Sequence, residues 1–323
     1  MDHKDAFKAW GTLLHGRKPL LSIELTKECP LRCPGCYAYD PHHLGGNVTL
    51  RQLSDEKGDE LVRRVLAIVD ELRPLHLSIV GGDPLVRYRE LIILLPELVK
   101  RGIYVQLVTS AFRQIPAEWR NLSNFKLAVS IDGLPAEHDK RRAPATYDRI
   151  LKNVAGHKIT VHCTITSQLL QRPTYIEEFL RFWQERPEAN QIWISIFTPQ
   201  VGSSDVEILS PGQRRYVVDE LLRLRDHISK LDMAPAMIRG FLSPPSAPDQ
   251  CVFSQVTETI SADLNTRITP CQFGGTPDCS QCGCAASMGL HSFAERRVAG
   301  VTVRKLFTIS NAVGKGVRQL KAA

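Results

Sequence analysis

Residues 25–38 read LTKECPLRCPGCYA, and the architecture of the chain can be worked out from this loop. The loop follows an apolar, strand-like run, Leu20 to Leu25, and it places Cys29, Cys33 and Cys36 in a C-x3-C-x2-C spacing. Three thiolates on one tight loop suit soft metal ions and iron–sulfur clusters. Because a cubane cluster has four irons, three cysteines leave one iron open to a small molecule.

Zinc is the alternative for this loop. Zinc sites usually show paired C-x2-C knuckles with a fourth ligand nearby. No second knuckle lies close, but His42 and His43 follow within ten residues, so spacing alone leaves zinc open.

The cysteine spacing, followed by the aromatic Tyr37, resembles the signature of the radical S-adenosylmethionine (SAM) enzymes. The resemblance implies that Cys29, Cys33 and Cys36 hold a [4Fe-4S] cluster whose open iron chelates the amino and carboxylate groups of SAM. It also implies the chemistry: one electron splits SAM into methionine and a 5′-deoxyadenosyl radical, which removes hydrogen from an unactivated carbon.

Downstream of the loop, short apolar runs alternate with helical patterns, as in an α/β protein with a parallel sheet. Strand count alone leaves a doubly wound sheet open; the resemblance favours a partial (β/α)6 barrel with a small C-terminal iron–sulfur domain. The expected strands are Leu21–Leu25, Leu77–Val80, Tyr104–Thr109, Lys126–Ile131, Thr160–Thr166 and Ile192–Phe197. The expected helices are Leu53–Leu72 with Ser54 as N-cap, Arg87–Arg101, Thr146–Val154, Tyr175–Glu185 and Gly212–Leu231, with a weaker one at Pro116–Leu122.

We divide the chain into an N-terminal extension (1–19), the barrel (20–232) and an auxiliary-cluster domain with a basic tail (233–323). Residues 1–19 form a short helix or an extended lead-in, too short for a peptide-binding domain. The proline-rich run from Met233 to Pro248 is expected to be a linker.

The second strand ends in Gly81-Gly82-Asp83-Pro84, where glycines let a backbone approach closely. A plain turn explains this run about equally well by itself. After the cysteine loop it resembles the family's Gly-Gly-Glu-Pro motif, which receives the SAM amino group, with Asp83 in place of the usual Glu.

The fourth strand continues into Ser130-Ile-Asp132-Gly and His138-Asp-x-x-Arg142. Alone, these residues could be turn formers and a solvated basic patch. Together they resemble a segment of the radical SAM subgroup with extra clusters, which implies that Ser130 and Asp132 lie at the cofactor. Arg142, rather than Arg141, would pair with the SAM carboxylate, since guanidinium can make two charge-assisted hydrogen bonds.

The fifth and sixth strands supply Thr166 and Phe197 as further SAM contacts by the same resemblance. Strand-end caps and core packing explain these two residues about as well. Cys163, in the middle of a strand, is expected to be a small buried hydrophobe.

A second cysteine group contains Cys251, Cys271, Cys279, Cys282 and Cys284. The run from Val256 to Ile268 alternates as a hairpin would, and Cys251 and Cys271 flank it. This resembles the opening of SPASM and twitch domains, which implies one auxiliary [4Fe-4S] cluster held by four of the five cysteines, with the place of Cys284 left open. Zinc is again the alternative.

The bulk composition is that of an ordinary soluble protein, with 43% hydrophobic and 23% charged residues. The chain shows no apolar run of membrane-spanning length and no signal-peptide core, which predicts a cytoplasmic protein whose cysteines bind metal instead of forming disulfides.

The net charge of +7 lies in the tail: residues 296–323 hold seven basic and no acidic residues, and the rest balances. The tail is expected to form an amphipathic helix with Leu306, Ile309, Val313, Val317 and Leu320 on one stripe. It could pack on the barrel, or contact an anionic substrate, an acidic flavodoxin- or ferredoxin-type electron donor, or an anionic membrane surface.

We therefore predict a radical SAM enzyme acting on a small molecule or lipid. The alternatives are a peptide-modifying radical SAM enzyme and, in another class, a non-catalytic metal-cluster protein that binds nucleic acid through its tail. Balanced charge outside the tail disfavours nucleic acid.

Overall fold

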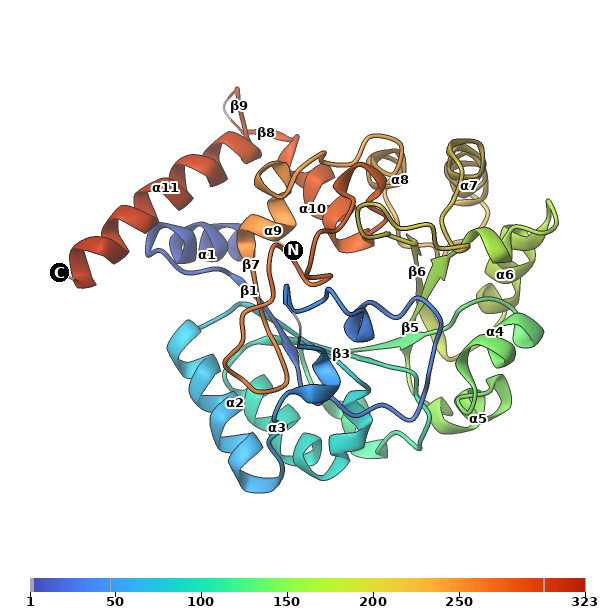
Figure 1. Ribbon diagram of the computed structural model, residues 1–323, viewed down its shortest axis with the longest axis horizontal. Coiled ribbons are helices and arrows are strands. Elements are labelled where there is room, and N and C mark those ends of the chain that lie inside the picture. The colour runs from blue at the N-terminus through green and yellow to red at the C-terminus, as the bar shows by residue number, and fades with distance from the viewer. Residues whose placement is uncertain (1–2, 47, 299, 323) are drawn as a thin grey trace.

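The centre of the computed structural model is one parallel sheet curved into an open barrel, with helices on its outer side (Figure 1). The structure describes residues 3–46, 48–298 and 300–322. The main strands are β1 (Leu20–Glu24), β2 (His76–Val80), β3 (Tyr104–Thr109), β4 (Phe125–Ser130), β5 (Ile159–Ile165) and β6 (Ala189–Ile196). The helices between them are α2 (Gly58–Leu72), α3 (Tyr88–Lys100), α4 (Pro135–Arg142), α5 (Tyr147–Val154), α6 (Tyr175–Gln184) and α7 (Pro211–Leu224).

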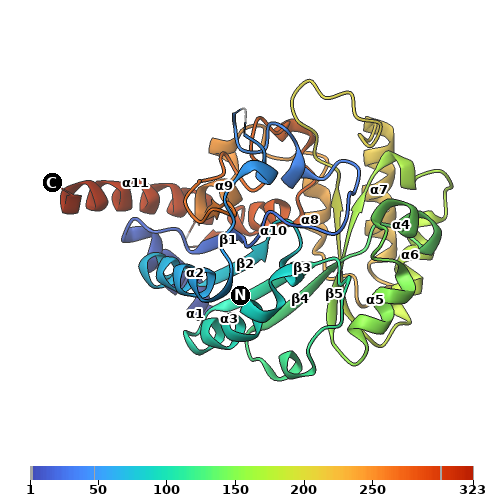
Figure 2. The same cartoon turned by 60° about the horizontal axis from the view of Figure 1, so that its bottom comes forward.

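All six expected strands are present, each within three residues of its predicted ends. They pair in parallel in the order β6-β5-β4-β3-β2-β1, as a series of right-handed crossovers produces. A further parallel strand, β7 (Thr257–Ile260), joins the free edge of β1. The sheet therefore has seven strands and stays open, with β6 and β7 at its edges (Figure 1), and Figure 2 shows β1 to β5 from below.

Successive residues of these strands point alternately to the helices and to the barrel interior. On β5, Val161 and Cys163 are fully buried in the main hydrophobic core, which confirms the prediction for Cys163. His162 and Thr164, between and after them, are only partly buried. The inner face of the barrel thus keeps polar side chains.

Two helices differ from their predicted bounds because tertiary contacts override the local pattern. Residues 53–57, which were predicted to begin helix α2, are not helical. Asp55 in this segment instead accepts a hydrogen bond from Thr26 Oγ1 (2.9 Å) and forms an ion pair with Arg87 (2.6 Å). Ser54 is therefore not the N-cap. Helix α7 ends at Leu224 rather than Leu231; the chain then runs beside β6, where Lys230 O accepts a hydrogen bond from Ile192 N (2.7 Å). The weak candidate at 116–122 is a 3-10 turn, Ala117–Asn121.

The proline-rich segment is not an exposed linker. It contains helix α8 (Pro235–Gly240), and Met233, Ile238 and Phe241 are buried in the same core as the barrel strands. Alternating prolines and apolar residues here reflect a segment packed on the barrel, not a solvated connection. Helices α9 (Val252–Val256) and α10 (Ala285–Ala294) follow.

The expected hairpin over 256–268 is only partly correct. Its first half, β7, belongs to the main sheet, and antiparallel pairing is limited to a bridge between Ile260 and Arg267. Leu264 takes the left-handed backbone conformation in the turn (φ 59°).

The opposite edge of the sheet is covered by the run that contains Cys282 and Cys284. Ile196 N donates to Gly283 O (2.9 Å), and Gly283 N donates to Thr198 Oγ1 (2.9 Å). A Cβ at position 283 would overlap the carbonyl oxygen of Ile196, so only glycine allows this approach. The C-terminal segment therefore reaches from one edge of the open barrel to the other.

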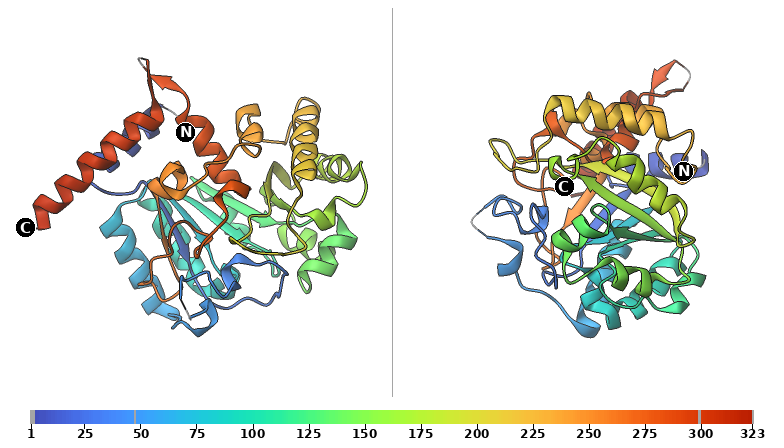
Figure 3. Two further views of the ribbon diagram at one scale, coloured as in Figure 1. Left: turned by 45° about the horizontal axis from the view of Figure 1, so that its top comes forward. Right: turned by 90° about the vertical axis from the view of Figure 1, so that its right-hand side faces the viewer.

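The terminal helices α1 (His3–Leu14) and α11 (Val303–Ala322) lie side by side, and α11 projects from the body (Figure 3). Trp10 Nε1 hydrogen-bonds Ser310 Oγ (2.5 Å), and Gly314 allows contact with Leu13. The predicted apolar stripe is not the packed face: Ile309 and Val313 are 53% and 49% exposed. The side chain of Leu320 lies outside those described. Within the described ranges, every helix is too short or too polar to cross a lipid bilayer.

Candidate cluster and cofactor site

The first cysteine loop lies at the carboxyl ends of the barrel strands, directly after β1. Burial raises the pKa of the Cys29 thiol to about 12, and Asp83, Cys33 and Cys36 act on it as neighbouring negative groups. Leu31 N–H points at Cys29 Sγ (3.4 Å), and a backbone N–H from Ala38 lowers the pKa of Cys36 against the effect of burial. Amide donors beside sulfur favour thiolate ligands.

Gly81 and Gly82 place the end of β2 against the chain that leads into this loop. Both have positive φ, 80° and 48°. A Cβ at Gly81 would overlap Glu24, and one at Gly82 would overlap Glu28 O. Positions 81 and 82 therefore require glycine because they lie against residues 24–28. Asp83 N adds to this contact by donating a hydrogen bond to Glu28 O (2.9 Å).

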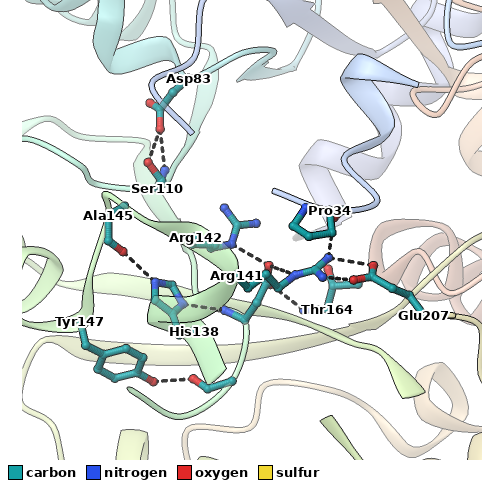
Figure 4. A network of polar contacts seen from close by, with 12 residues as sticks. Pro34, Asp83, Ser110, His138, Arg141, Arg142, Ala145, Tyr147, Thr164 and Glu207 are labelled. Carbon is teal, nitrogen blue, oxygen red and sulfur yellow. Dashed lines mark hydrogen bonds and ion pairs between the residues drawn. The ribbon is translucent and has the colours of Figure 1, made fainter. Parts of the chain in front are cut away.

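The Asp83 side chain holds the ends of β2 and β3 together. It accepts hydrogen bonds from Thr109 Oγ1 (2.7 Å), Ser110 N (2.9 Å) and Leu85 N (3.0 Å). Figure 4 shows the bonds to Ser110. Burial raises the pKa of Asp83, and these donors oppose the rise. Its short side chain suits this bonding better than the longer Glu would.

Asp132 and Arg142 meet just after the end of β4. Figure 4 shows Arg142 together with Arg141, which contacts Pro34 of the cysteine loop. Arg142 Nε donates to Asp132 Oδ2 (2.6 Å). Burial would raise the pKa of Asp132, but Arg142 and Arg141 together lower it. Cys33 and Cys36 in turn raise the pKa of Arg142, so this guanidinium lies in reach of the cysteine sulfurs. Only its Nε is engaged among the hydrogen bonds of the described residues.

Arg141 differs because its guanidinium is already fully used. It contacts Asp132 through Nε (3.1 Å), Pro34 O through Nη2 (2.9 Å) and Glu207 through both Nη atoms. Glu207, which no sequence motif singled out, lies in an irregular loop after β6. The Arg141–Glu207 pair connects that loop to the backbone of the cysteine loop at Pro34. Arg142, in contrast, keeps both Nη groups free of hydrogen bonds to the described residues.

His138 and Asp139 of the predicted motif have structural roles. His138 Nδ1 accepts from Asp132 N (3.0 Å), while Nε2 reaches Ala145 O (2.9 Å). Asp139 Oδ1 accepts from Tyr147 N (2.8 Å), the first residue of α5. These bonds fix helix α4, and with it the direction of Arg142.

The other residues that were predicted to contact SAM lie in different surroundings. Phe197 packs on Gly35, since a Cβ at position 35 would lie 2.9 Å from its ring. Ser130 ends β4 opposite His162, and Thr166 is buried after β5. The Tyr37 ring instead makes edge contacts with His43 (5.5 Å) and Phe273 (5.4 Å), on the side of the second cysteine group.

A buried polar cluster that the sequence did not reveal joins the two cysteine-bearing segments. Glu24 accepts hydrogen bonds from His43 Nε2 (2.8 Å) and Ser261 Oγ (2.7 Å), and His43 Nδ1 contacts Phe273 O (2.8 Å). Both nitrogens of His43 are therefore occupied, which removes it as a zinc ligand.

The five cysteines of the second group all line one pocket. The rest of its lining is prolines, phenylalanines and a few hydroxyls, with no charged side chain. Burial raises the pKa of Cys271 to about 12 and of Cys282 to about 11, and in each case the other cysteines add to the rise. Cys284, at the N-cap of α10, is the most deeply buried of these five cysteines. Its Sγ accepts a hydrogen bond from Ser287 N (3.5 Å).

The donor sets fit iron–sulfur clusters. All nine cysteines are free thiols, and eight of them gather in two groups. The three-cysteine loop would hold one cluster, and four cysteines of the pocket would hold another.

These features define an open α/β barrel with two candidate thiolate cluster sites, one of them beside the Arg142 guanidinium, which contacts Asp132 through Nε alone among the hydrogen bonds of the described residues. The model of the radical SAM superfamily matches residues 23–182. The chain belongs to this superfamily, whose cofactors are a [4Fe-4S] cluster and SAM.

Among curated proteins, the chain is similar to the PqqA peptide cyclase of Rhizobium meliloti (strain 1021), with 32% identity over 121 residues, 36% of this chain and 30% of that protein. The PqqA peptide cyclase of Methylobacterium nodulans is 33% identical over 90 residues, 28% of this chain and 21% of that protein. The chain thus matches less than a third of the length of these curated relatives.

Among solved structures, the fold is similar to Streptococcus suis SuiB bound to precursor peptide SuiA, with a TM-score of 0.58 and 15% identity over 80% of this chain and 61% of that one. It is also similar to anSMEcpe with bound AdoMet, with a TM-score of 0.56 and 16% identity over 90% of this chain and 83% of that one. These likenesses confirm the fold class, an unclosed parallel α/β barrel.

Proposed function

We propose that this protein is a radical SAM enzyme of the subgroup with an auxiliary cluster, and that it modifies a peptide. The observation that carries the proposal is the match over 121 residues to PqqA peptide cyclase, which by its name modifies a peptide. The fold likeness to SuiB, solved with its precursor peptide, supports the same direction. This favours a peptide over the small molecule or lipid that we expected from the sequence.

In the proposed reaction, Cys29, Cys33 and Cys36 hold the cluster that binds SAM. With SAM bound there and one electron from a reductant, the cofactor would supply the chemistry that removes a hydrogen atom from a carbon of the peptide. The protein's part is to place and orient. Arg142 offers its free Nη groups to the SAM carboxylate, and Asp132 holds the guanidinium by its Nε.

The residues around the loop also restrict water. Phe197 covers Gly35, and the Arg141–Glu207 pair fastens the loop after β6 over the cysteine segment. A dry site protects a reactive carbon radical from side reactions. The auxiliary cluster, in the uncharged pocket of the second cysteine group, would take up an electron from the substrate or bind the substrate directly.

The test begins with anaerobic reconstitution of the clusters, followed by SAM and dithionite. We expect chromatography to detect 5′-deoxyadenosine. Peptides encoded by short reading frames near the gene are then added, and mass spectrometry should show a change in peptide mass that requires SAM.

The outcomes separate the alternatives. SAM cleavage with a changed small molecule or lipid but no changed peptide would refute the peptide substrate. Intact, reducible clusters without SAM cleavage would refute the enzyme and favour the non-catalytic binding protein.

A further inference from the structure

The inner wall of the barrel carries a histidine that the cluster sites do not use. His162 lies on β5 and faces the interior, since its neighbours Val161 and Cys163 are buried on the helix side. It stands opposite Ser130 of β4 and Trp193 of β6 in the strand register. The ring is only partly buried, so it lines space inside the barrel.

His162 is tied to the second cysteine segment through Ser195. Its Nε2 lies 2.9 Å from Ser195 Oγ. The same oxygen lies 3.2 Å from Ala285 N, the residue after Cys284. This serine therefore links the ring to the start of α10.

The donor and acceptor roles at Ser195 Oγ then determine the tautomer of the His162 ring. Ala285 N–H can only donate, so Ser195 Oγ accepts there. Among the described residues, the remaining partner of Ser195 Oγ is His162 Nε2, and a buried hydroxyl proton needs an acceptor. Ser195 therefore donates to Nε2, which leaves the proton of a neutral imidazole on Nδ1.

The charges around His162 favour the neutral ring. Burial lowers the pKa of His162, the nearby Arg142 lowers it further, and Asp132 opposes them. The ring is thus a neutral donor through Nδ1, and the hydrogen bonds of the described residues give that nitrogen no protein partner. A neutral donor without a protein partner, on a partly exposed residue of the inner wall, is suited to a ligand oxygen.

We propose that His162 is a substrate-binding residue that donates its Nδ1 proton to an amide carbonyl oxygen of the peptide held inside the barrel. The inference rests on the proposed function for the identity of the ligand as a peptide. A nitrogen that can only donate bonds to carbonyl oxygens and not to amide N–H groups, so it helps to fix which side of the peptide bond faces the wall. Ser195 is the positioning residue, because it sets the tautomer.

The first test measures the tautomer without SAM or substrate. Nitrogen-15 NMR of the full chain labelled at histidine distinguishes protonated from unprotonated ring nitrogens, and His162→Gln identifies the resonances. We expect a protonated Nδ1 in the wild type, and a shift toward protonated Nε2 in Ser195→Ala. Thr164→Ala, on the same wall but without a hydrogen bond to the ring, should leave the spectrum unchanged. A wild-type proton on Nε2, or on both nitrogens, would overturn the proposal.

The second test uses N-acetylglycine N-methylamide as a minimal peptide probe and acetate as a carboxylate probe. The amide should shift the Nδ1 resonance saturably in the wild type, and about five- to tenfold more weakly in Ser195→Ala, as expected for one hydrogen bond. The exposed His15 reports non-specific effects. A response to acetate alone, or to neither probe, contradicts the amide assignment. Since neither test requires SAM cleavage, a failure here is distinguishable from a failure of the proposed enzyme activity.

Discussion

The two cysteine groups are built in different surroundings, although both gather thiols. The first group lies at the strand ends beside Asp132 and Arg142, with amide donors close to sulfur. The second lines a pocket of prolines, phenylalanines and hydroxyls without a charged side chain. A charged rim can bind a zwitterionic ligand next to a cluster, whereas an uncharged pocket offers no charged partner to such a ligand. We therefore propose that SAM binds at the first group and not at the second.

The strongest test of this contrast removes the first group alone. The variant Cys29→Ala/Cys33→Ala/Cys36→Ala should lose SAM cleavage by a factor of about a thousand or more, since the cofactor has no site. It should still bind about four irons per chain in the second pocket, because a cubane cluster needs only four thiolates there. Iron analysis together with 5′-deoxyadenosine formation measures both. A variant without iron would mean that the two sites do not form independently.

The charged rim is tested by Arg142→Gln. Losing a charge-assisted hydrogen bond to a carboxylate costs about 1.5–3 kcal/mol, so SAM should bind roughly ten- to a hundredfold more weakly. Calorimetric titration of the reconstituted, oxidised protein with SAM gives the affinity. Arg149→Gln, which removes an exposed cation from helix α5, is the matched control and should change little. Equal losses in both variants would indicate a general charge effect.

The attachment of the second group is tested at Gly283. Alanine there would overlap Ile196 O at the edge of β6, so we expect a loss of about 2 kcal/mol of stability and of auxiliary iron. Gly289→Ala, in helix α10, meets only Met237 at ordinary distance (3.7 Å) and should stabilise by about 0.5–1 kcal/mol. Thermal unfolding and iron content distinguish them, and a harmless Gly283→Ala would disprove the edge contact.

Much of the contrast between the groups could be predicted from local sequence. The C-x3-C-x2-C spacing and the β/α alternation are short-range patterns, so the strands and the first site were predictable. The different roles of Arg141 and Arg142 depend on Glu207, which lies 66 residues after Arg141 in the sequence. The Glu24–His43–Ser261 cluster joins residues that are up to 237 positions apart. Such contacts are fixed by the assembled barrel, and no local pattern records them.

The errors have the same physical origin. The apolar stripe on α11 predicted a packed face at Ile309 and Val313, yet the helix packs through Ser310 and Gly314 because small residues allow close approach to α1. Prolines between Met233 and Pro248 suggested a linker, although the apolar residues among them fill the core. Periodicity and composition describe what a segment can bury, while its neighbours decide what it does bury.

A final, smaller effect tests the amino-terminal end of the barrel, far along the strands from both cysteine groups. His76 begins β2, where burial, aided by Lys126, lowers its pKa to about 4. The folded protein therefore binds fewer protons there than the unfolded chain between pH 6.5 and 4. Its contribution is complete above pH 6.5 and falls as the pH drops through this window.

His76→Gln should remove that pH dependence. The free energy of unfolding of the wild type relative to that of the variant should therefore be about 1–2 kcal/mol higher at pH 7 than near pH 5. Urea unfolding at both pH values measures the difference. His15→Gln, at an exposed site, is the control and should leave the slope unchanged. If the two variants behave alike, His76 is solvated. If iron content changes as well, the amino-terminal end is coupled to the cysteine groups, and the contrast between them would have to include the whole barrel.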